Sequence, residues 1–213
     1  MAILIKAPKE ILLEGEYVIF KPDVSEEEFW KISDEDSNYE LINGVLIIHS
    51  PESEEHEDIF SHLNAIFRYY LQETGIGRVY GSRFVMRLSE KWNPEPDLLV
   101  VLSSNYKNVT ATRLEGPADL IVEILSKATR ETDLEKKLPK YLEAGVKEVW
   151  IIDPETKTIA LHSSKGTKAY PDPNSQQEIN SDILKEIHLR VQWIWDRDKF
   201  SSSKIIQQIM KKH

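Results

Sequence analysis

The sequence predicts a protein of mixed α/β class that forms a single domain over residues 1–213. In the segment 119–126, residues 120–125 are apolar on both faces apart from Glu123, which predicts a strand that is buried on both sides. No repeat, low-complexity block or linker interrupts the chain. The clearest strand patterns lie at residues 97–102, 119–126 and 147–153, and the clearest helical patterns at residues 53–74 and 132–144.

Local signals predict a helix and a hairpin near the N-terminus. Ser25 and Glu28 have the spacing of a capping box at the start of a helix. Asn43-Gly44 between two apolar runs predicts a two-residue turn with positive φ at both positions. Glu40 lies on the first arm of this hairpin. A glutamate on a strand usually faces solvent, and the alternative is a third carboxylate near a site.

The middle of the chain is expected to contain a long helix followed by further strands. Residues 53–74 carry a continuous apolar stripe, and Gly75 is the residue type favoured just after a helix. His56 falls in the acidic first turn, where a surface position is the simpler interpretation and a ligand or base the alternative. Residues 78–88 are typical of one or two strands, and residues 103–116 are typical of a polar loop.

On the helical segment at residues 132–144, two neighbouring lysines are expected to point in different directions. Lys137 lies on the flank of the apolar stripe, whereas Lys136 points away from it. Asp133, one turn before Lys137, is placed to pair with it. Pro139 should bend the helix because it lacks an N–H group. Beyond it, residues 183–213 are expected to add a last strand at 186–195 and a polar C-terminal helix at 201–213.

Composition limits the classes of partner and of chemistry. The chain has no cysteine, no apolar run long enough to cross a membrane and no signal-peptide pattern, which favours a cytoplasmic protein without thiolate chemistry. The formal charge is −9, but residues 1–60 account for −12, which leaves +3 for the rest. Basic residues cluster around the second helix: Lys127, Arg130, Lys136, Lys137 and Lys140. This distribution permits nucleic-acid binding.

Glu123 is the residue that first suggests a site. An ionised carboxylate on a strand buried on both faces is strongly unfavourable unless a cation or a metal meets it. Asp97 begins an apolar segment expected to pair in the same sheet, and adjacent carboxylates repel unless a proton or a divalent cation separates them. Oxygen ligands suit Mg²⁺ or Mn²⁺, and a nearby lysine can orient water or stabilise charge on a phosphate. The simpler alternatives are a turn residue at Asp97 and a structural ion pair at Glu123.

Several motifs, in their order and spacing, resemble a known nuclease superfamily. Between Tyr39 and His162 the sequence contains YELINGVL, SPESEEH, PEPDLLVV, IVEILSKATRETDLEKK and YLEAGVKEVWIIDP. The chain resembles the PD-(D/E)XK restriction-endonuclease-like superfamily and, more narrowly, its Uma-type putative restriction endonuclease branch. The resemblance implies a central mixed β-sheet flanked by α-helices, with a core at about residues 39–162 and an added N-terminal hairpin and helix. It also implies a metal-dependent endonuclease that acts on DNA, with a homodimer as a common assembly.

The resemblance also implies roles for individual residues. Asp97 and Glu123 match the ligands of Mg²⁺ or Mn²⁺, to which the backbone carbonyl of Ile124 can add. The superfamily places its lysine two residues after the second ligand, where this chain has Leu125, and Lys137 on the next helix is the best match. Three further polar residues complete the implied group: Asp133, which would tune that lysine, and the catalytic candidates Glu40 and His56. Candidate nucleic-acid contacts are Lys127, Arg130, Lys136 and Lys140.

Two other classes of function stay open. The net acidity and the leucine at position 125 favour a catalytically degenerate nuclease-fold module that binds nucleic acid or a protein partner. A carboxylate-based hydrolase of small molecules is the third class.

Overall fold

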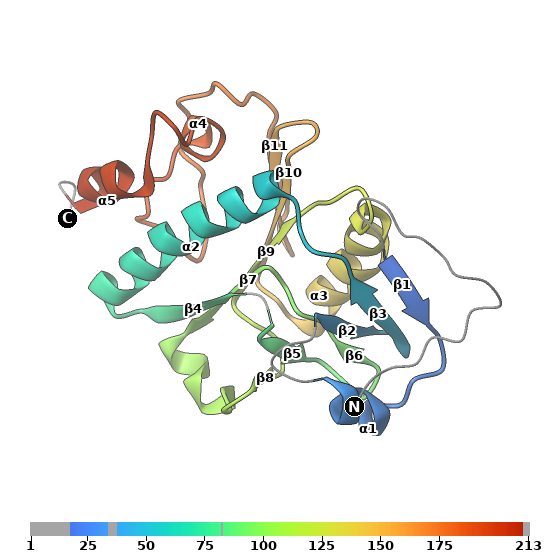
Figure 1. The fold of residues 1–213 in the computed structure, drawn as a ribbon. Coiled ribbons are helices and arrows are strands. Elements are labelled where there is room, and N and C mark those ends of the chain that lie inside the picture. Colours follow the sequence, from blue (N-terminus) through green and yellow to red (C-terminus); the bar gives the residue numbers. More distant parts are fainter. Residues whose placement is uncertain (1–17, 34–37, 82, 211–213) are drawn as a thin grey trace.

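The computed structural model describes residues 18–33, 38–81 and 83–210 and is built around a six-stranded mixed sheet (Figure 1). β9 and β10 are parallel, and every other neighbouring pair in this sheet is antiparallel. The strand order is β12 (Gly166–Tyr170), β11 (Thr158–Ser163), β10 (Glu148–Asp153), β9 (Leu120–Ile124), β7 (Leu98–Leu102) and β4 (Gly77–Gly81). The central mixed sheet of the prediction is confirmed.

Helices cover both faces of this sheet, which explains why its central strands β9 and β10 carry mostly apolar residues on both faces. α2 (Glu54–Thr74) lies across one face (Figure 1), and its Phe67 meets Trp150 of β10 edge to face with ring centroids 5.3 Å apart. α3 (Leu138–Ala144) covers the other face, where Tyr141 packs in an apolar cluster with Ile121. Alternate residues of each strand therefore enter opposite cores. Within the described ranges, none of the helices is long and apolar enough to cross a membrane.

A second, four-stranded sheet carries the predicted N-terminal hairpin. β2 and β3 are antiparallel and meet at Asn43 and Gly44, whose φ values of 53° and 76° are both positive, as predicted. α1 (Glu26–Ile32) begins with the predicted capping box of Ser25 and Glu28. The strand order is β1 (Val18–Lys21), β3 (Val45–His49), β2 (Tyr39–Ile42) and β6 (Trp92–Asn93).

The expected strands at 78–88 form β4 and β5 (Val85–Arg87), and β5 pairs with β8 (Arg113–Glu115). The latter lies in the segment that was expected to be a loop, together with a 3₁₀ helix at Ser103–Asn108. The prediction of a polar loop over residues 103–116 is therefore wrong for the parts that form the 3₁₀ helix and β8. The pairing of β8 with a strand far away in the sequence supplies the hydrogen bonds that its short, polar sequence does not signal.

The helix that carries Lys137 is irregular at its start. Thr132–Lys137 form a π-helical stretch, in which the N–H of Leu138 donates to the carbonyl oxygen of Asp133, one residue beyond the α-helical partner. Pro139 follows directly, lacks an N–H and crowds the carbonyl of the preceding turn. The irregularity expected at the proline thus takes the form of a widened turn, a feature that is frequent at functional sites.

The C-terminal segment corrects one prediction. The strand expected at 186–195 is wrong, because Val191–Trp195 form the short helix α4 and the residues before it make one isolated bridge, Glu178 to Arg190. Apolar residues alternate before α4, but there they pack on the core against α2 instead of extending a sheet. The C-terminal helix is confirmed as α5 (Ser202–Met210), and residues 211–213 of that prediction lie outside the described residues.

Candidate active site

Three carboxylates from different elements converge on the ammonium group of Lys137. Its Nζ lies 2.9 Å from Glu123 Oε1 of β9, 3.0 Å from Glu40 Oε1 of β2 and 3.1 Å from Asp133 Oδ1 of the π-helical stretch. All four side chains are buried, with exposed fractions of 2% to 6%. The cation that a buried Glu123 requires therefore comes from the following helix, and the pairing of Lys137 with Asp133 is the one that the helical spacing predicted.

The position two residues after Glu123 has no polar role. Leu125 belongs to the apolar cluster that contains Tyr141. The hydroxyl of Tyr141 donates a hydrogen bond of 2.6 Å to Glu123 Oε1, the oxygen that also contacts Lys137. Both contacts use Oε1, so they do not occupy Oε2. Glu123 thus contacts a lysine from the following helix, and not a residue of its own strand.

Asp97 is tied to the neighbouring strand and to a histidine. Its Oδ2 accepts the backbone N–H of Ile124 at 2.7 Å, and His56 Nε2 lies 3.3 Å from the same oxygen. Burial lowers the pKa of His56, but the Asp97 carboxylate, with Glu52 and Glu57, outweighs it and raises that pKa to about 9. His56 is 5% exposed, so the surface interpretation of this residue is wrong. Its Nδ1 is buried and has no hydrogen-bond partner among the described residues.

Glu40 does not face solvent. Its Oε2 lies 2.9 Å from His49 Nε2, and its Oε1 accepts the backbone N–H of Glu95 at 2.7 Å. Burial raises the pKa of Glu40, but Lys137, His49 and the Glu95 N–H outweigh it and lower that pKa. The alternative interpretation of Glu40, a third carboxylate at the site, is the one that the geometry favours.

Two residues at the site, His49 and Glu95, have no role in the sequence prediction. The hairpin register could have indicated His49, because Glu40 pairs with Ile47 and residues two apart on a strand share a face. Glu95 approaches Glu40 only through the pairing of distant segments, which no local pattern signals.

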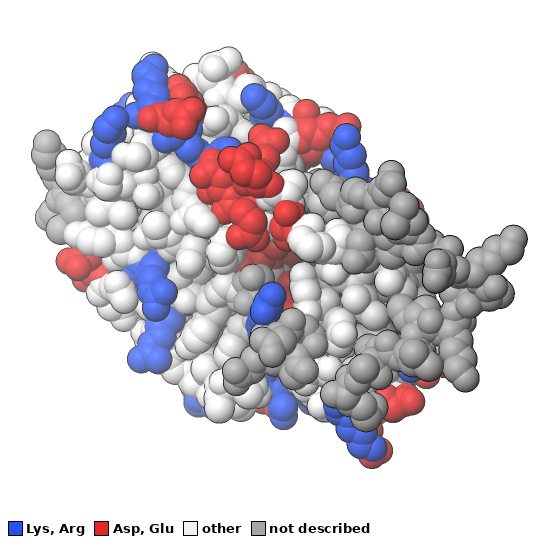
Figure 2. All heavy atoms as spheres, viewed as in Figure 1, with Lys and Arg blue, Asp and Glu red and all other residues white. Residues whose placement is uncertain are grey.

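These groups line a cavity of about 600 Å³. Its wall is acidic, because seven of its lining residues carry carboxylates: Glu40, Glu52, Glu57, Glu95, Asp97, Glu123 and Asp133. In Figure 2, Asp and Glu side chains gather on this face over the start of α2. The cavity brings together the predicted residues Asp97, Glu123, Ile124, Lys137, Asp133, Glu40 and His56.

The oxygen donors at this cavity fit a hard divalent cation. Burial raises the pKa of Glu123, the charge of Lys137 opposes the rise, and the charges of Asp133, Asp97 and Glu40 add to it. The crowding of these carboxyl groups around one lysine therefore favours uptake of a proton or of a further cation. In the described part of the chain, no group of three or more His, Asp or Glu side chains is arranged to hold a metal. Mg²⁺ commonly uses only one or two carboxylates and takes its other ligands from water and phosphate, so the types of donor in this cavity are compatible with this cation.

The predicted nucleic-acid contacts lie outside the described lining of the cavity. Arg130 pairs with Asp153 at 2.6 Å, and Lys140 lies 3.2 Å from Glu143. Lys136 lies 6.0 Å from the ring centroid of Phe20. These basic side chains and the exposed Lys127 lie on or just before the helix that carries Lys137. They do not line the cavity described above.

Residues 26–192 match the model of the Uma2 family, whose description is "Putative restriction endonuclease". The chain belongs to this family. The matched range contains all the described residues that line the cavity, and it confirms the family resemblance seen in the sequence motifs.

A solved structure has the same fold as this chain. It is the crystal structure of a putative nuclease belonging to DUF820 from Anabaena variabilis ATCC 29413. The TM-score is 0.71 at 21% sequence identity, and the alignment covers 84% of this chain and 98% of the other. No curated protein matches the chain.

Proposed function

We propose that this Uma2 protein is a divalent-metal-dependent endonuclease that hydrolyses phosphodiester bonds of DNA. The observation that carries the proposal is the 2.9 Å contact between Lys137 and Glu123 in a cavity that Asp97 also lines. Lys137 would take the role of the lysine that the superfamily motif has at the position where this chain has Leu125. Restriction-endonuclease-like proteins typically use a divalent metal, which suits the oxygen donors of this cavity.

In this mechanism Asp97 and Glu123 would hold Mg²⁺ or Mn²⁺, with the backbone carbonyl of Ile124 as a further ligand. When bound, the ion would polarise the scissile phosphate and lower the pKa of a water molecule. His56 and the Ile124 N–H both contact Oδ2 of Asp97 and so fix the orientation of its carboxylate. In this mechanism the protein would hold the carboxylates of Asp97 and Glu123 in fixed positions in the cavity.

Lys137 would act on the attacking water and on the phosphate. Its ammonium group would exchange one of its three carboxylate contacts for a hydrogen bond that orients the attacking water, and its charge would stabilise the charge that develops on the phosphate. Asp133 and Glu40 fix the position of Lys137, because each carboxylate lies within 3.1 Å of Nζ. His49 in turn holds Glu40 from the other side.

Cleavage assays test this proposal. Purified protein is incubated with plasmid, single-stranded and branched DNA in Mg²⁺ or Mn²⁺, alongside Asp97→Ala and the exposed control Asp198→Ala. We expect cleavage by the wild type and the control and a loss of roughly 100-fold or more for Asp97→Ala. Equal cleavage by wild type and Asp97→Ala would sink the proposal, as would no cleavage of any substrate.

A second candidate is a binding module that does not cut. The acidic wall of the cavity and the engagement of Lys137 by three carboxylates favour it. Calorimetric titration with Mg²⁺ and Mn²⁺ separates the two, because a module without metal chemistry does not bind either ion at millimolar concentration. DNA as the nucleic acid, a homodimer, a single domain over residues 1–213 and a cytoplasmic location stay predictions from the sequence.

A further inference from the structure

A second permanently charged cation lies on the cavity wall, and the mechanism above does not use it. Arg83 lines the cavity from the segment between β4 and β5. This residue is exposed, whereas Lys137 is 3% exposed at the floor. The two cations therefore lie at different depths, Arg83 where a ligand would enter and Lys137 where the carboxylates converge.

The charge of the cavity makes a cation at this position important for an anionic ligand. Among the described lining residues, seven carry carboxylates, and the permanent cations are Lys137 and Arg83. Lys137 is held by three of those carboxylates at 2.9 to 3.1 Å. A phosphodiester that approaches the cavity consequently meets repulsion from carboxylates and attraction from Arg83. The guanidinium fork matches the geometry of phosphate oxygens and can donate two parallel hydrogen bonds to them.

The backbone of Arg83 provides an independent observation. Its φ of 70° lies in the left-handed region, which glycine or asparagine adopts more easily than arginine. Residues other than glycine in such conformations concentrate at active sites and ligand-binding positions. Arg83 also interacts electrostatically with Glu95, the buried carboxyl beside Glu40 on the cavity wall. The local backbone thus presents the guanidinium on the same wall as the candidate catalytic residues.

We propose that Arg83 forms a phosphate-binding subsite that receives a phosphodiester of the nucleic acid next to the one that is cut. This inference rests on the proposed function for its substrate class. Arg83 would be a substrate-binding residue, which acts on the approach of the nucleic acid and not on the metal or the water.

A salt titration of binding tests the subsite apart from cleavage. The background is Asp97→Ala, which the proposed function expects not to cut, and the probes are a fluorescein-labelled oligo(dT) and a matching duplex. Arg83→Gly removes the side chain and suits the positive φ, so the fold is expected to be retained. Arg68→Ala is the matched control, because Arg68 is exposed on α2 and lies outside the described lining of the cavity.

We expect Arg83→Gly to weaken binding roughly 10- to 100-fold and to reduce the slope of log K against log salt by about 0.7 to 0.9, the loss of one phosphate contact. Arg83→Lys should recover part of the affinity, and Arg68→Ala should keep the full slope. With Mg²⁺ in the otherwise wild-type chain, Arg83→Gly should raise KM by a similar factor and change kcat by less than about threefold.

The outcomes separate the two proposals. Unchanged affinity and slope in Arg83→Gly overturn the subsite, as does a loss equal to that of Arg68→Ala, and both leave the cleavage assay untouched. A background protein that does not bind either probe also overturns the subsite. Equal cleavage by wild type and Asp97→Ala overturns the proposed function alone, since a slope change in Arg83→Gly would still support the phosphate contact.

Discussion

Two buried glutamates on neighbouring strands meet opposite environments. Glu123 of β9 and Glu148 of β10 are 3% and 2% exposed, and both strands lie at the centre of the six-stranded sheet. They belong to opposite faces, because Glu148 shares its face with Trp150, whereas Glu123 lies on the face of Ile121. One sheet thus buries a carboxylate on each side.

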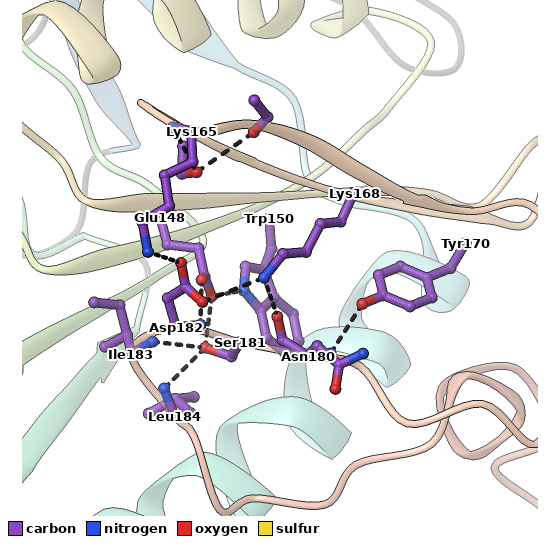
Figure 3. Close-up of polar contacts among 12 residues, drawn as sticks. Glu148, Trp150, Lys165, Lys168, Tyr170, Asn180, Ser181, Asp182, Ile183 and Leu184 are labelled. Atoms are coloured by element: carbon purple, nitrogen blue, oxygen red, sulfur yellow. Dashed lines mark hydrogen bonds and ion pairs between the residues drawn. The ribbon is translucent and has the colours of Figure 1, made fainter.

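The donors that satisfy each carboxylate differ in kind. Glu148 accepts hydrogen bonds from the Trp150 indole at 2.6 Å, the Ser181 hydroxyl at 2.6 Å and the Asp182 backbone N–H at 2.7 Å (Figure 3). These groups are neutral. Outside them, Asp182 itself pairs with Lys165 at 2.9 Å. Glu148 therefore fastens the segment around Ser181 to the sheet, and it is not among the described residues that line the cavity.

Glu123, by contrast, shares one lysine with two other carboxylates and borders a cavity. Burial of a carboxylate therefore does not by itself indicate a functional site. Crowding of several carboxyl groups is a better indication of such a site, because a cation from solution can relieve their mutual repulsion. Three experiments test this contrast, and their expected effects decrease in the order given.

The largest effect is expected at Lys137. Lys137→Met leaves three buried carboxylates without their cation, so the free energy of unfolding in metal-free buffer should fall by about 3–5 kcal/mol. Cleavage should fall by roughly 100- to 1000-fold. Urea denaturation and initial cleavage rates measure the two effects. Lys136→Met is the control, because that side chain is exposed one residue away. Identical behaviour of the two variants contradicts the role of Lys137.

The second test exchanges each glutamate for its amide. Glu148→Gln places an NH₂ group against one of three donors, so the free energy of unfolding should fall by about 1–3 kcal/mol, with cleavage per folded molecule unchanged. Glu123→Gln keeps an acceptor for Tyr141 and Lys137 and removes charge repulsion. Its stability should change by less than about 1 kcal/mol, although cleavage is lost. The contrast fails if Glu148→Gln abolishes cleavage or if Glu123→Gln cuts like the wild type.

The smallest effect concerns Asp153, at the opposite end of β10 from Glu148. Burial raises the pKa of Asp153, but hydrogen bonds from Arg130 and Thr156 outweigh it and lower that pKa to about 2. A carboxyl group whose folded pKa lies below its unfolded value stabilises the fold above the unfolded pKa. This stability is lost as the pH falls from about 4 to about 2.

Asp153→Asn should therefore lower the free energy of unfolding by about 1 kcal/mol at neutral pH, after allowance for solvent screening, and by less near pH 2. Urea denaturation of the two proteins at several pH values measures the difference. A deficit that stays constant down to pH 2 would show that the ionised carboxylate does not contribute this stability.

Part of the fold and of the candidate site could be predicted because the signals are local. The capping box of Ser25 and the turn at Asn43-Gly44 depend on hydrogen bonds and dihedral angles within a few residues. The different directions of Lys136 and Lys137 follow from helix geometry on one element. The prediction of a strand at 186–195 is wrong because alternation is also only a local signal. It indicates which residues are buried, but not whether a neighbouring strand is available to pair with them.

Local patterns predict the elements that carry Asp97, Glu123 and Lys137, and the order of these residues indicates the family. The burial of Glu40 and His56, the presence of His49 and Glu95 beside them, and the neutral donors around Glu148 depend on tertiary packing. Those outcomes depend on which strands become neighbours and which helix covers each face. Side chains that are distant along the chain meet only after that packing, so no short-range pattern records the contacts.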